Sequence, residues 1–246
     1  MRLLIALILI LCTTPLTFAA TGKTITYSVG GASYEGYLTS PDPQAPLVIL
    51  IHDWDGLNDY EMQRADMLFK LGYNVFAADL FGAGIRPTSI DERKKLTGEL
   101  YQNREKMRSL LLAAVNTARD NGVKSTKAVA AGYCFGGAAV LEMARSGADL
   151  QGFVSFHGGL TTPAGQDYSK VKGKILVLHG TADESVSMND FSTLAQEMEK
   201  SHVPHEMITY SGAPHAFTVF GSERYREDAD KKSWRRFTEF LEETVH

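Results

Sequence analysis

Short apolar runs alternate along the chain with longer stretches in which apolar residues recur at helical spacing. Strands are predicted at residues 25–29, 34–38, 47–51, 74–78, 128–131, 152–156, 175–178 and 206–210. The first two alternate around Gly30-Gly31, which predicts an N-terminal β-hairpin. A continuous apolar run such as 47–51 is typical of a strand buried on both faces of a parallel sheet.

Helices are predicted between these strands. Asn58 and Glu61 have the spacing of a capping box, and Gly72 ends the apolar stripe that follows them. Further stripes cover residues 107–118, 191–198 and 234–241. Strands that alternate with helices predict one α/β domain over residues 20–246, with a mostly parallel central sheet flanked by helices. Its ligand site is expected at the carboxyl ends of the strands.

Residues 1–19 have the pattern of a signal peptide. Arg2 supplies the positive charge, residues 3–11 the apolar segment, and Thr17-Phe18-Ala19 a cleavage site with small residues. The apolar segment is too short for a transmembrane helix, which needs roughly 20 residues. The alternative is a buried N-terminal helix. We expect a soluble exported protein, most simply in a bacterial periplasm.

Composition narrows the function further. The 246 residues carry a net charge of −4 and no long run of Lys or Arg, which argues against nucleic-acid binding. No segment after the signal is apolar enough to span a membrane, and we expect a monomer. Loss of Cys12 with the signal leaves Cys134 as the one thiol, so an internal disulfide is excluded.

Cys134 lies in a motif that carries chemistry. The run 132–137, Gly-Tyr-Cys-Phe-Gly-Gly, follows a predicted strand and opens an Ala-rich helix, as in a nucleophile elbow with sulfur in place of oxygen. Gly132 and Gly136 are expected where a side chain would collide with the neighbouring chain. The helix N-terminus should lower the pKa of the thiol. The alternative is an inert buried cysteine at a Gly-rich junction.

Two further residues complete a candidate triad. Asp183 follows the predicted strand 175–178, and His215 follows the strand 206–210. The order nucleophile, acid, histidine is that of α/β-hydrolases, and all three residues fall at carboxyl ends of strands. We therefore expect Cys134, Asp183 and His215 to act together.

These segments resemble the dienelactone hydrolase family, whose members have the α/β-hydrolase fold and use a Cys-Asp-His triad. The matching segments are 132–137, 179–183, 214–217, 52–57 and 78–81. The resemblance implies an oxyanion hole formed by the backbone N–H groups of Trp54 and Phe135. It also implies that Asp53 stands where relatives have a glutamate that holds the resting thiol. Asp53 either does so or bonds its own loop.

The resemblance also implies arginines that bind a substrate carboxylate. Arg86 is the candidate for one of these arginines. It is either a substrate-binding residue or a solvated surface charge. The position of the other is Val219, so a dianionic dienelactone is a poor candidate substrate. His52 and His157 are interpreted as structural groups, since their spacing gives no zinc signature.

The sequence thus predicts a hydrolase that cleaves a small carboxylic ester or lactone through a cysteine acyl-enzyme, without metal or cofactor. The alternative is a non-catalytic exported binding protein or a thiol redox sensor on a hydrolase scaffold.

Overall fold

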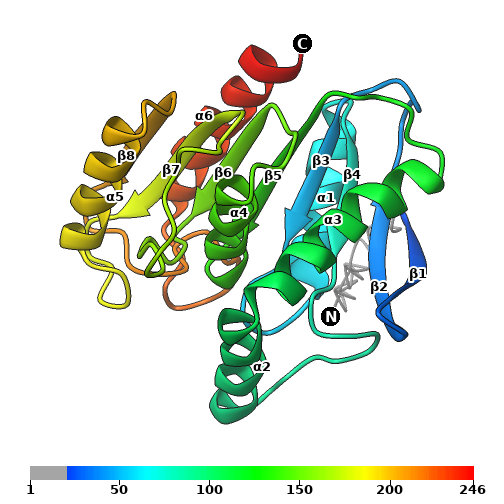
Figure 1. Ribbon diagram of the computed structural model, residues 1–246, viewed down its shortest axis with the longest axis horizontal. Coiled ribbons are helices and arrows are strands. Elements are labelled where there is room, and N and C mark those ends of the chain that lie inside the picture. The colour runs from blue at the N-terminus through cyan, green and yellow to red at the C-terminus, as the bar shows by residue number, and fades with distance from the viewer. Residues whose placement is uncertain (1–20) are drawn as a thin grey trace, which may run out of the picture.

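The computed structural model describes residues 21–246, so the predicted signal peptide lies outside the described residues. The described part contains one sheet of eight strands (Figure 1). They are β1 (Lys23–Val29), β2 (Ala32–Thr39), β3 (Leu47–Ile51), β4 (Asn74–Ala78), β5 (Ala128–Tyr133), β6 (Gly152–Phe156), β7 (Lys174–Gly180) and β8 (His205–Tyr210). Their spatial order is β1-β2-β4-β3-β5-β6-β7-β8. Strands β3 to β8 run parallel, and the β1–β2 hairpin joins antiparallel to β4, which confirms the predicted fold class.

Helices cover both faces of the sheet (Figure 1). They are α1 (Asp59–Lys70), α2 (Ile90–Gln102), α3 (Arg104–Asp120), α4 (Phe135–Arg145), α5 (Met188–Lys200) and α6 (Glu227–Val245). Helices α1 and α6 pack on one face, and α3, α4 and α5 on the other. No helix within residues 21–246 has both the length and the apolar character that a membrane crossing needs.

Strand β3 shows why the central strands are apolar throughout. Leu47, Ile49 and Ile51 belong to the core under α3 and α4, whereas Val48 and Leu50 belong to the core under α1 and α6. All five are fully buried. Side chains alternate between faces along a strand, so a sheet covered on both sides needs apolar residues at every position.

Helix α2 was not predicted from the apolar pattern. Only Thr97 and Leu100 are buried in it, and Gly98 stands in its interior, so its apolar stripe is weak. Ser89 and Glu92 do form a capping box at its start. Figure 1 shows α2 extending past the edge at which the parallel strands end.

The turn from β5 to α4 is tight. Cys134, the N-cap of α4, has φ 49°, in the left-handed region that non-glycine residues rarely adopt. A Cβ on Gly132 would lie 2.3 Å from the carbonyl oxygen of Gly136, and one on Gly136 would lie 2.3 Å from that of Ile51. Both glycines are therefore required by close backbone contact, as expected from the sequence.

Gly136→Ala is expected to destabilise the protein by about 1–3 kcal/mol or more, because the obstructing atoms belong to the backbone of β3. Denaturant unfolding followed by circular dichroism measures the change. Gly98→Ala is the matched control: its Cβ meets no atom within 4 Å, and we expect a gain of about 0.5–1 kcal/mol. Equal unfolding midpoints for Gly136→Ala and the parent would contradict this account of the turn.

Candidate active site

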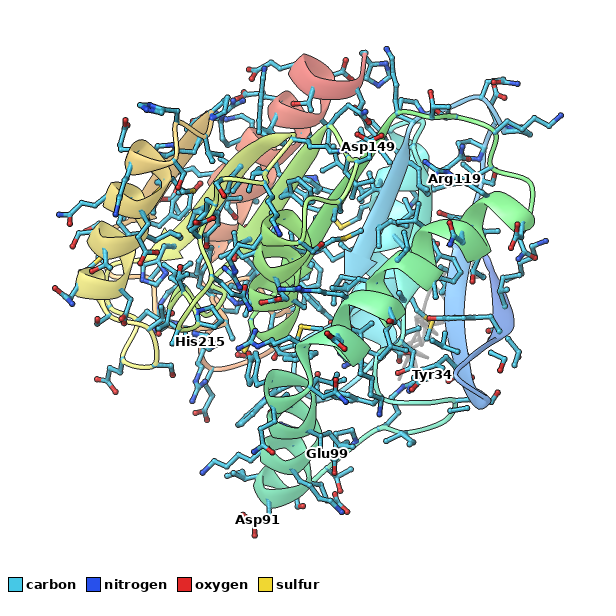
Figure 2. All side chains as sticks on the ribbon, viewed as in Figure 1. Tyr34, Asp91, Glu99, Arg119, Asp149 and His215 are labelled. Atoms are coloured by element: carbon cyan, nitrogen blue, oxygen red, sulfur yellow. The ribbon has the colours of Figure 1, made fainter. Side chains whose placement is uncertain are left out.

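The three predicted side chains meet at the carboxyl edge of the sheet. His215 Nε2 lies 3.0 Å from Cys134 Sγ, and His215 Nδ1 lies 2.8 Å from Asp183 Oδ2. Cys134 follows β5, Asp183 follows β7, and His215 lies in the loop after β8. Figure 2 places His215 at the end of the molecule toward which these strands run. The structure thus brings together residues that are far apart in the chain.

The ionised carboxylate of Asp183 is suited to orient the His215 imidazole. Its second oxygen accepts hydrogen bonds from the backbone N–H groups of Ser185 and Val186, at 2.8 and 2.9 Å. Burial by itself would raise the pKa of Asp183, but the hydrogen bond and the charge of His215 bring that pKa below its usual value. The carboxylate therefore stays ionised beside Nδ1 of the histidine.

Cys134 rests as a thiol. Burial raises the pKa of its thiol well above the usual value, and the Asp53 carboxylate raises it further by its charge and by a hydrogen bond. The N–H of Phe135 bonds the sulfur and acts in the opposite direction. The expectation that the helix N-terminus lowers this pKa is wrong for the resting protein, because burial and the nearby carboxylate outweigh the helix.

Asp53 contacts both the thiol and a candidate oxyanion donor. Its carboxylate hydrogen-bonds Cys134, and its Oδ1 accepts the backbone N–H of Trp54 at 2.5 Å. Burial raises the pKa of Asp53 to about 6. Both alternatives left open by the sequence therefore occur together, since the same carboxylate bonds the thiol and its own loop.

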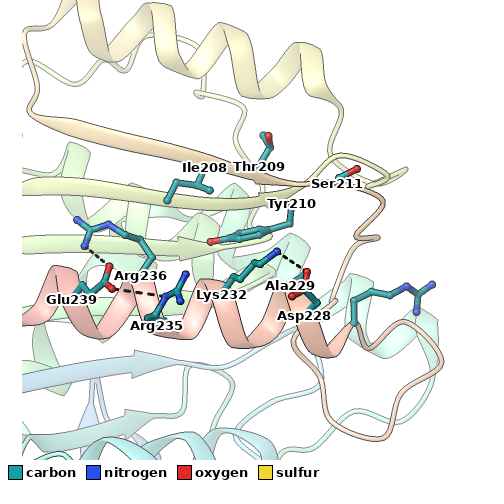
Figure 3. Close-up of a pocket in the computed structure, with 11 residues that line it drawn as sticks. Ile208, Thr209, Tyr210, Ser211, Asp228, Ala229, Lys232, Arg235, Arg236 and Glu239 are labelled. Carbon is teal, nitrogen blue, oxygen red and sulfur yellow. Dashed lines mark hydrogen bonds and ion pairs between the residues drawn. The ribbon is translucent and has the colours of Figure 1, made fainter.

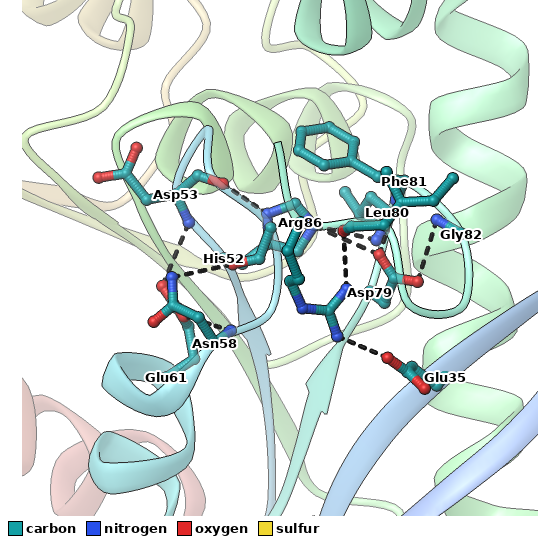
Figure 4. Close-up of polar contacts among 12 residues, drawn as sticks. Glu35, His52, Asp53, Asn58, Glu61, Asp79, Leu80, Phe81, Gly82 and Arg86 are labelled. Atoms are coloured by element: carbon teal, nitrogen blue, oxygen red, sulfur yellow. Dashed lines mark hydrogen bonds and ion pairs between the residues drawn. The ribbon is translucent and has the colours of Figure 1, made fainter. Parts of the chain in front are cut away.

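Two buried side chains hold this loop in place (Figure 4). The side-chain oxygens of Glu61 accept hydrogen bonds from the backbone N–H groups of Asp53 and Asn58, at 3.3 and 3.2 Å. His52 accepts the N–H of Leu80 at Nε2, so its Nδ1–H donates to the Asp53 carbonyl oxygen. Burial lowers the pKa of His52 to about 4, which keeps this ring neutral. The expectation that His52 is a structural group agrees with these contacts.

The guanidinium of Arg86 is engaged by contacts of its own. Its guanidinium donates to the Glu35 carboxylate at 2.6 Å and to the Ile85 carbonyl oxygen at 2.8 Å (Figure 4). Val219, four residues after His215, packs against the core under α1 and α6. The two positions that the resemblance assigned to carboxylate binding therefore hold one engaged cation and one apolar side chain.

Helix α2 adds residues to the site that the sequence did not indicate. The Arg93 guanidinium lies over the Trp54 ring, 5.3 Å from its centroid. The Tyr101 ring packs edge-on against Phe135 at 5.5 Å. Since the apolar pattern of α2 is weak, its capping box was the one sequence signal that could have predicted the helix that carries these side chains.

Residues 21–246 contain no group of three or more His, Cys, Asp or Glu side chains that could hold a metal ion. A groove of about 640 Å³ lies between β8 and α6, and none of its lining residues belongs to the candidate triad (Figure 3). Its Lys232 and Arg235 are paired with Asp228 and Glu239. The groove is therefore a surface of mutually paired charges.

Comparison with known proteins shows which family and which solved structures this chain is similar to. The sequence profile of the dienelactone hydrolase family matches residues 34–245. A Saccharolobus solfataricus protein provisionally named carboxymethylenebutenolidase is 27% identical over 255 residues, covering 89% of this chain and 97% of its own. Protein usf of Aquifex pyrophilus is 28% identical over 202 residues, covering 80% and 87%. A solved dienelactone hydrolase-like promiscuous phosphotriesterase from metagenomic libraries has a TM-score of 0.85 and 28% identity, covering 92% and 99%.

Proposed function

The chain belongs to the dienelactone hydrolase family, and we propose that it hydrolyses small carboxylic esters or lactones through a covalent intermediate on Cys134. The observation that carries the proposal is the continuous contact from Asp183 through His215 to the Cys134 sulfur, at 2.8 and 3.0 Å. A nucleophile, a base and a group that orients the base are the three parts of covalent acyl transfer.

Substrate binding starts by displacing Asp53. In the resting protein the N–H of Trp54 is bound to the Asp53 carboxylate, so a substrate carbonyl oxygen has to take that place. The N–H of Phe135, which points at the sulfur, supplies the second donor. Loss of the carboxylate also removes the charge that favours the thiol. Proton transfer from Cys134 to His215 then becomes easier at the moment when substrate is present.

Acylation and deacylation use the same imidazole. The sulfur of Cys134 attacks the carbonyl carbon while His215 Nε2 takes the thiol proton, and the two backbone N–H groups stabilise the oxyanion. The C–O bond breaks, the departing oxygen takes the proton from His215, and an acyl thioester remains. His215 then removes a proton from water, which attacks the thioester carbon. The C–S bond breaks, the thiol is restored, and the carboxylic acid leaves.

The surroundings favour a substrate without a second carboxylate. Arg86 is already paired with Glu35, and Val219 offers no charge. Nearby rings of Trp54, Phe135 and Tyr101 suit an apolar or aromatic group. The provisional name of the Saccharolobus relative supports lactones as one branch of the substrate class.

Asp53→Asn is expected to lower the pKa of the Cys134 thiol, because a negative charge that favours the protonated thiol is removed. Alkylation rates with iodoacetamide across pH measure it. The variant should react faster above pH 6, where Asp53 of the parent is ionised, and the difference should close below pH 6.

Asp55→Asn is the matched control, since it removes a carboxylate from the same loop but not one that bonds the sulfur. Identical alkylation profiles for Asp53→Asn and the parent would contradict the role given to Asp53.

A panel of neutral and anionic aryl esters and lactones tests the function. We expect a burst of one equivalent of phenol with good substrates and poor turnover of dicarboxylates. Stoichiometric alkylation of the thiol without turnover of any ester would instead favour a binding protein or a redox sensor.

Residues 1–19 are proposed to direct export. The intact mass of the exported protein should then equal that of residues 20–246.

A further inference from the structure

Thr218 is a buried hydroxyl that the proposed reaction does not use. It lies three residues after His215 in the loop between β8 and α6, and it is fully buried. Its Oγ1 lies 2.7 Å from the Tyr60 hydroxyl and 2.8 Å from His157 Nε2. Its carbonyl oxygen accepts a hydrogen bond from Arg64 Nη2 at 2.9 Å. The loop that carries the candidate base is thus fixed through both the side chain and the backbone of one residue.

Arg64 anchors the other end of this arrangement. Its guanidinium is 1% exposed, pairs with Asp230 of α6, and donates from Nε to the Tyr60 hydroxyl oxygen at 3.3 Å. It also lies over the rings of Phe220 and Trp234, at 4.2 and 5.0 Å. A guanidinium is a donor only, so the direction of the hydrogen bonds is set from this end. We name the series Arg64, Tyr60, Thr218 and His157 the Thr218 chain.

The direction of each hydrogen bond follows from donor and acceptor counting. The Tyr60 oxygen accepts from Arg64, so the Tyr60 hydrogen goes to Thr218 Oγ1. The Thr218 hydrogen then goes to His157 Nε2, which must be unprotonated and accepts it. If His157 donated instead, Thr218 would donate to Tyr60, and the Tyr60 hydrogen would turn to the Tyr133 hydroxyl, which it also contacts. That arrangement would leave Nδ1 without the hydrogen with which it contacts the backbone carbonyl oxygen of His157 itself. The neutral ring with hydrogen on Nδ1 therefore satisfies more of these contacts than the alternative.

His157 lies directly beside the candidate base. Its ring packs edge-to-face against the His215 ring, with centroids 5.4 Å apart, and its backbone N–H is tied to the Leu178 carbonyl oxygen of β7. Its φ of 39° is a left-handed conformation that the surrounding contacts maintain. A charge on His157 would oppose the imidazolium that His215 forms during acylation.

We infer that the Thr218 chain positions His215 and keeps the neighbouring His157 neutral, so that the proton of Cys134 can be received at His215. This inference rests on the proposed function. The residues of the Thr218 chain are positioning residues, because none of them contacts the Cys134 sulfur.

The charges around both rings agree with this assignment. Groups that face His157 are His215, Asp183 and His179, and the Tyr133 ring lies tilted against it with centroids 5.9 Å apart. Groups that face His215 are Asp183, Cys134, Asp53 and His157. Burial, followed by the charge of His215, holds the pKa of His157 well below its usual value. An ionised Asp183 acts in the opposite direction but is already bonded to His215.

NMR of the full chain labelled with ¹⁵N-histidine tests the inference without using activity. His157, assigned with the spectrum of His157→Gln, should carry hydrogen on Nδ1 and none on Nε2, without titrating between pH 5.5 and 8.5. A Nε2-protonated or titrating His157 in the parent would overturn the inference. This outcome is independent of whether any ester is turned over, so it is distinguished from failure of the proposed function.

A comparison of the Thr218→Val and Thr218→Ser variants tests the inference by enzyme kinetics. The valine keeps the shape but removes the hydroxyl, so kcat for a neutral aryl ester should fall roughly ten- to hundredfold. The acid limb of the kcat/KM profile should move to lower pH, because a proton on His157 disfavours one on His215. Serine should restore both. A valine variant with the parent kcat and pH profile would overturn the inference; if it does not fold, the serine variant and the parent spectrum decide.

Discussion

Cys134→Ala is expected to reduce turnover of a small aryl ester by about 10⁴-fold or more, to the level of the uncatalysed reaction. The sulfur is the one described group that contacts His215 Nε2 opposite its Asp183 bond, so we expect no other side chain within residues 21–246 to form the proposed intermediate in its place. Initial rates with p-nitrophenyl acetate measure the loss. Turnover within tenfold of the parent would remove Cys134 as nucleophile.

The fold should persist in this variant. Removal of the sulfur leaves the elbow glycines and both cores untouched, so far-UV circular dichroism should not change. The variant should also keep its affinity for a non-hydrolysable ether analogue of the ester, which has no carbonyl for the sulfur to attack, within a few-fold. A combined loss of folding and activity would instead make Cys134 a structural residue.

The second large effect is expected at the base and the group that orients it. His215→Gln and Asp183→Asn should each lower kcat by roughly 10⁴-fold, the first by removing proton transfer and the second by releasing the imidazole from its orientation. Because the groups act as a unit, the double variant should lose little more than the worse single variant.

Ser185→Ala is the matched control for Asp183→Asn. Ser185 contributes its backbone N–H to the Asp183 carboxylate, and alanine retains that N–H. We expect kcat within about threefold of the parent, in the range of surface substitutions away from such a site. Strictly multiplicative losses in the double variant would show that His215 and Asp183 act independently, contrary to the proposed triad.

The sheet was predictable because its signal is local. Strand β3 is a continuous apolar run, and the glycines of the elbow stand where backbone contact forbids a Cβ. The order of Cys134, Asp183 and His215, each after a parallel strand, then implies one edge of the sheet. Helix α2 was missed because it lies beyond that edge and buries little, so it lacks the apolar stripe on which the prediction depends.

Parts of the site depend on contacts that no local pattern encodes. The pairing of Arg86 with Glu35 joins a loop to strand β2 of the hairpin. The bond from Trp54 to Asp53 depends on the orientation of a single carboxylate inside its loop. Thr218 becomes a junction only when α1, β6 and the loop after β8 are packed together. Donor and acceptor counting therefore needed the three-dimensional arrangement.

The central claim is a transient bond between the Cys134 sulfur and an acyl carbon. Intact-protein mass spectrometry of acid-quenched protein, taken during the burst with p-nitrophenyl acetate, tests it directly. We expect one acetyl group per chain, on the peptide that contains Cys134, disappearing as the burst decays and absent from Cys134→Ala. An unmodified protein during turnover, or an acetyl group on another residue that appears and decays at the turnover rate, would contradict the account.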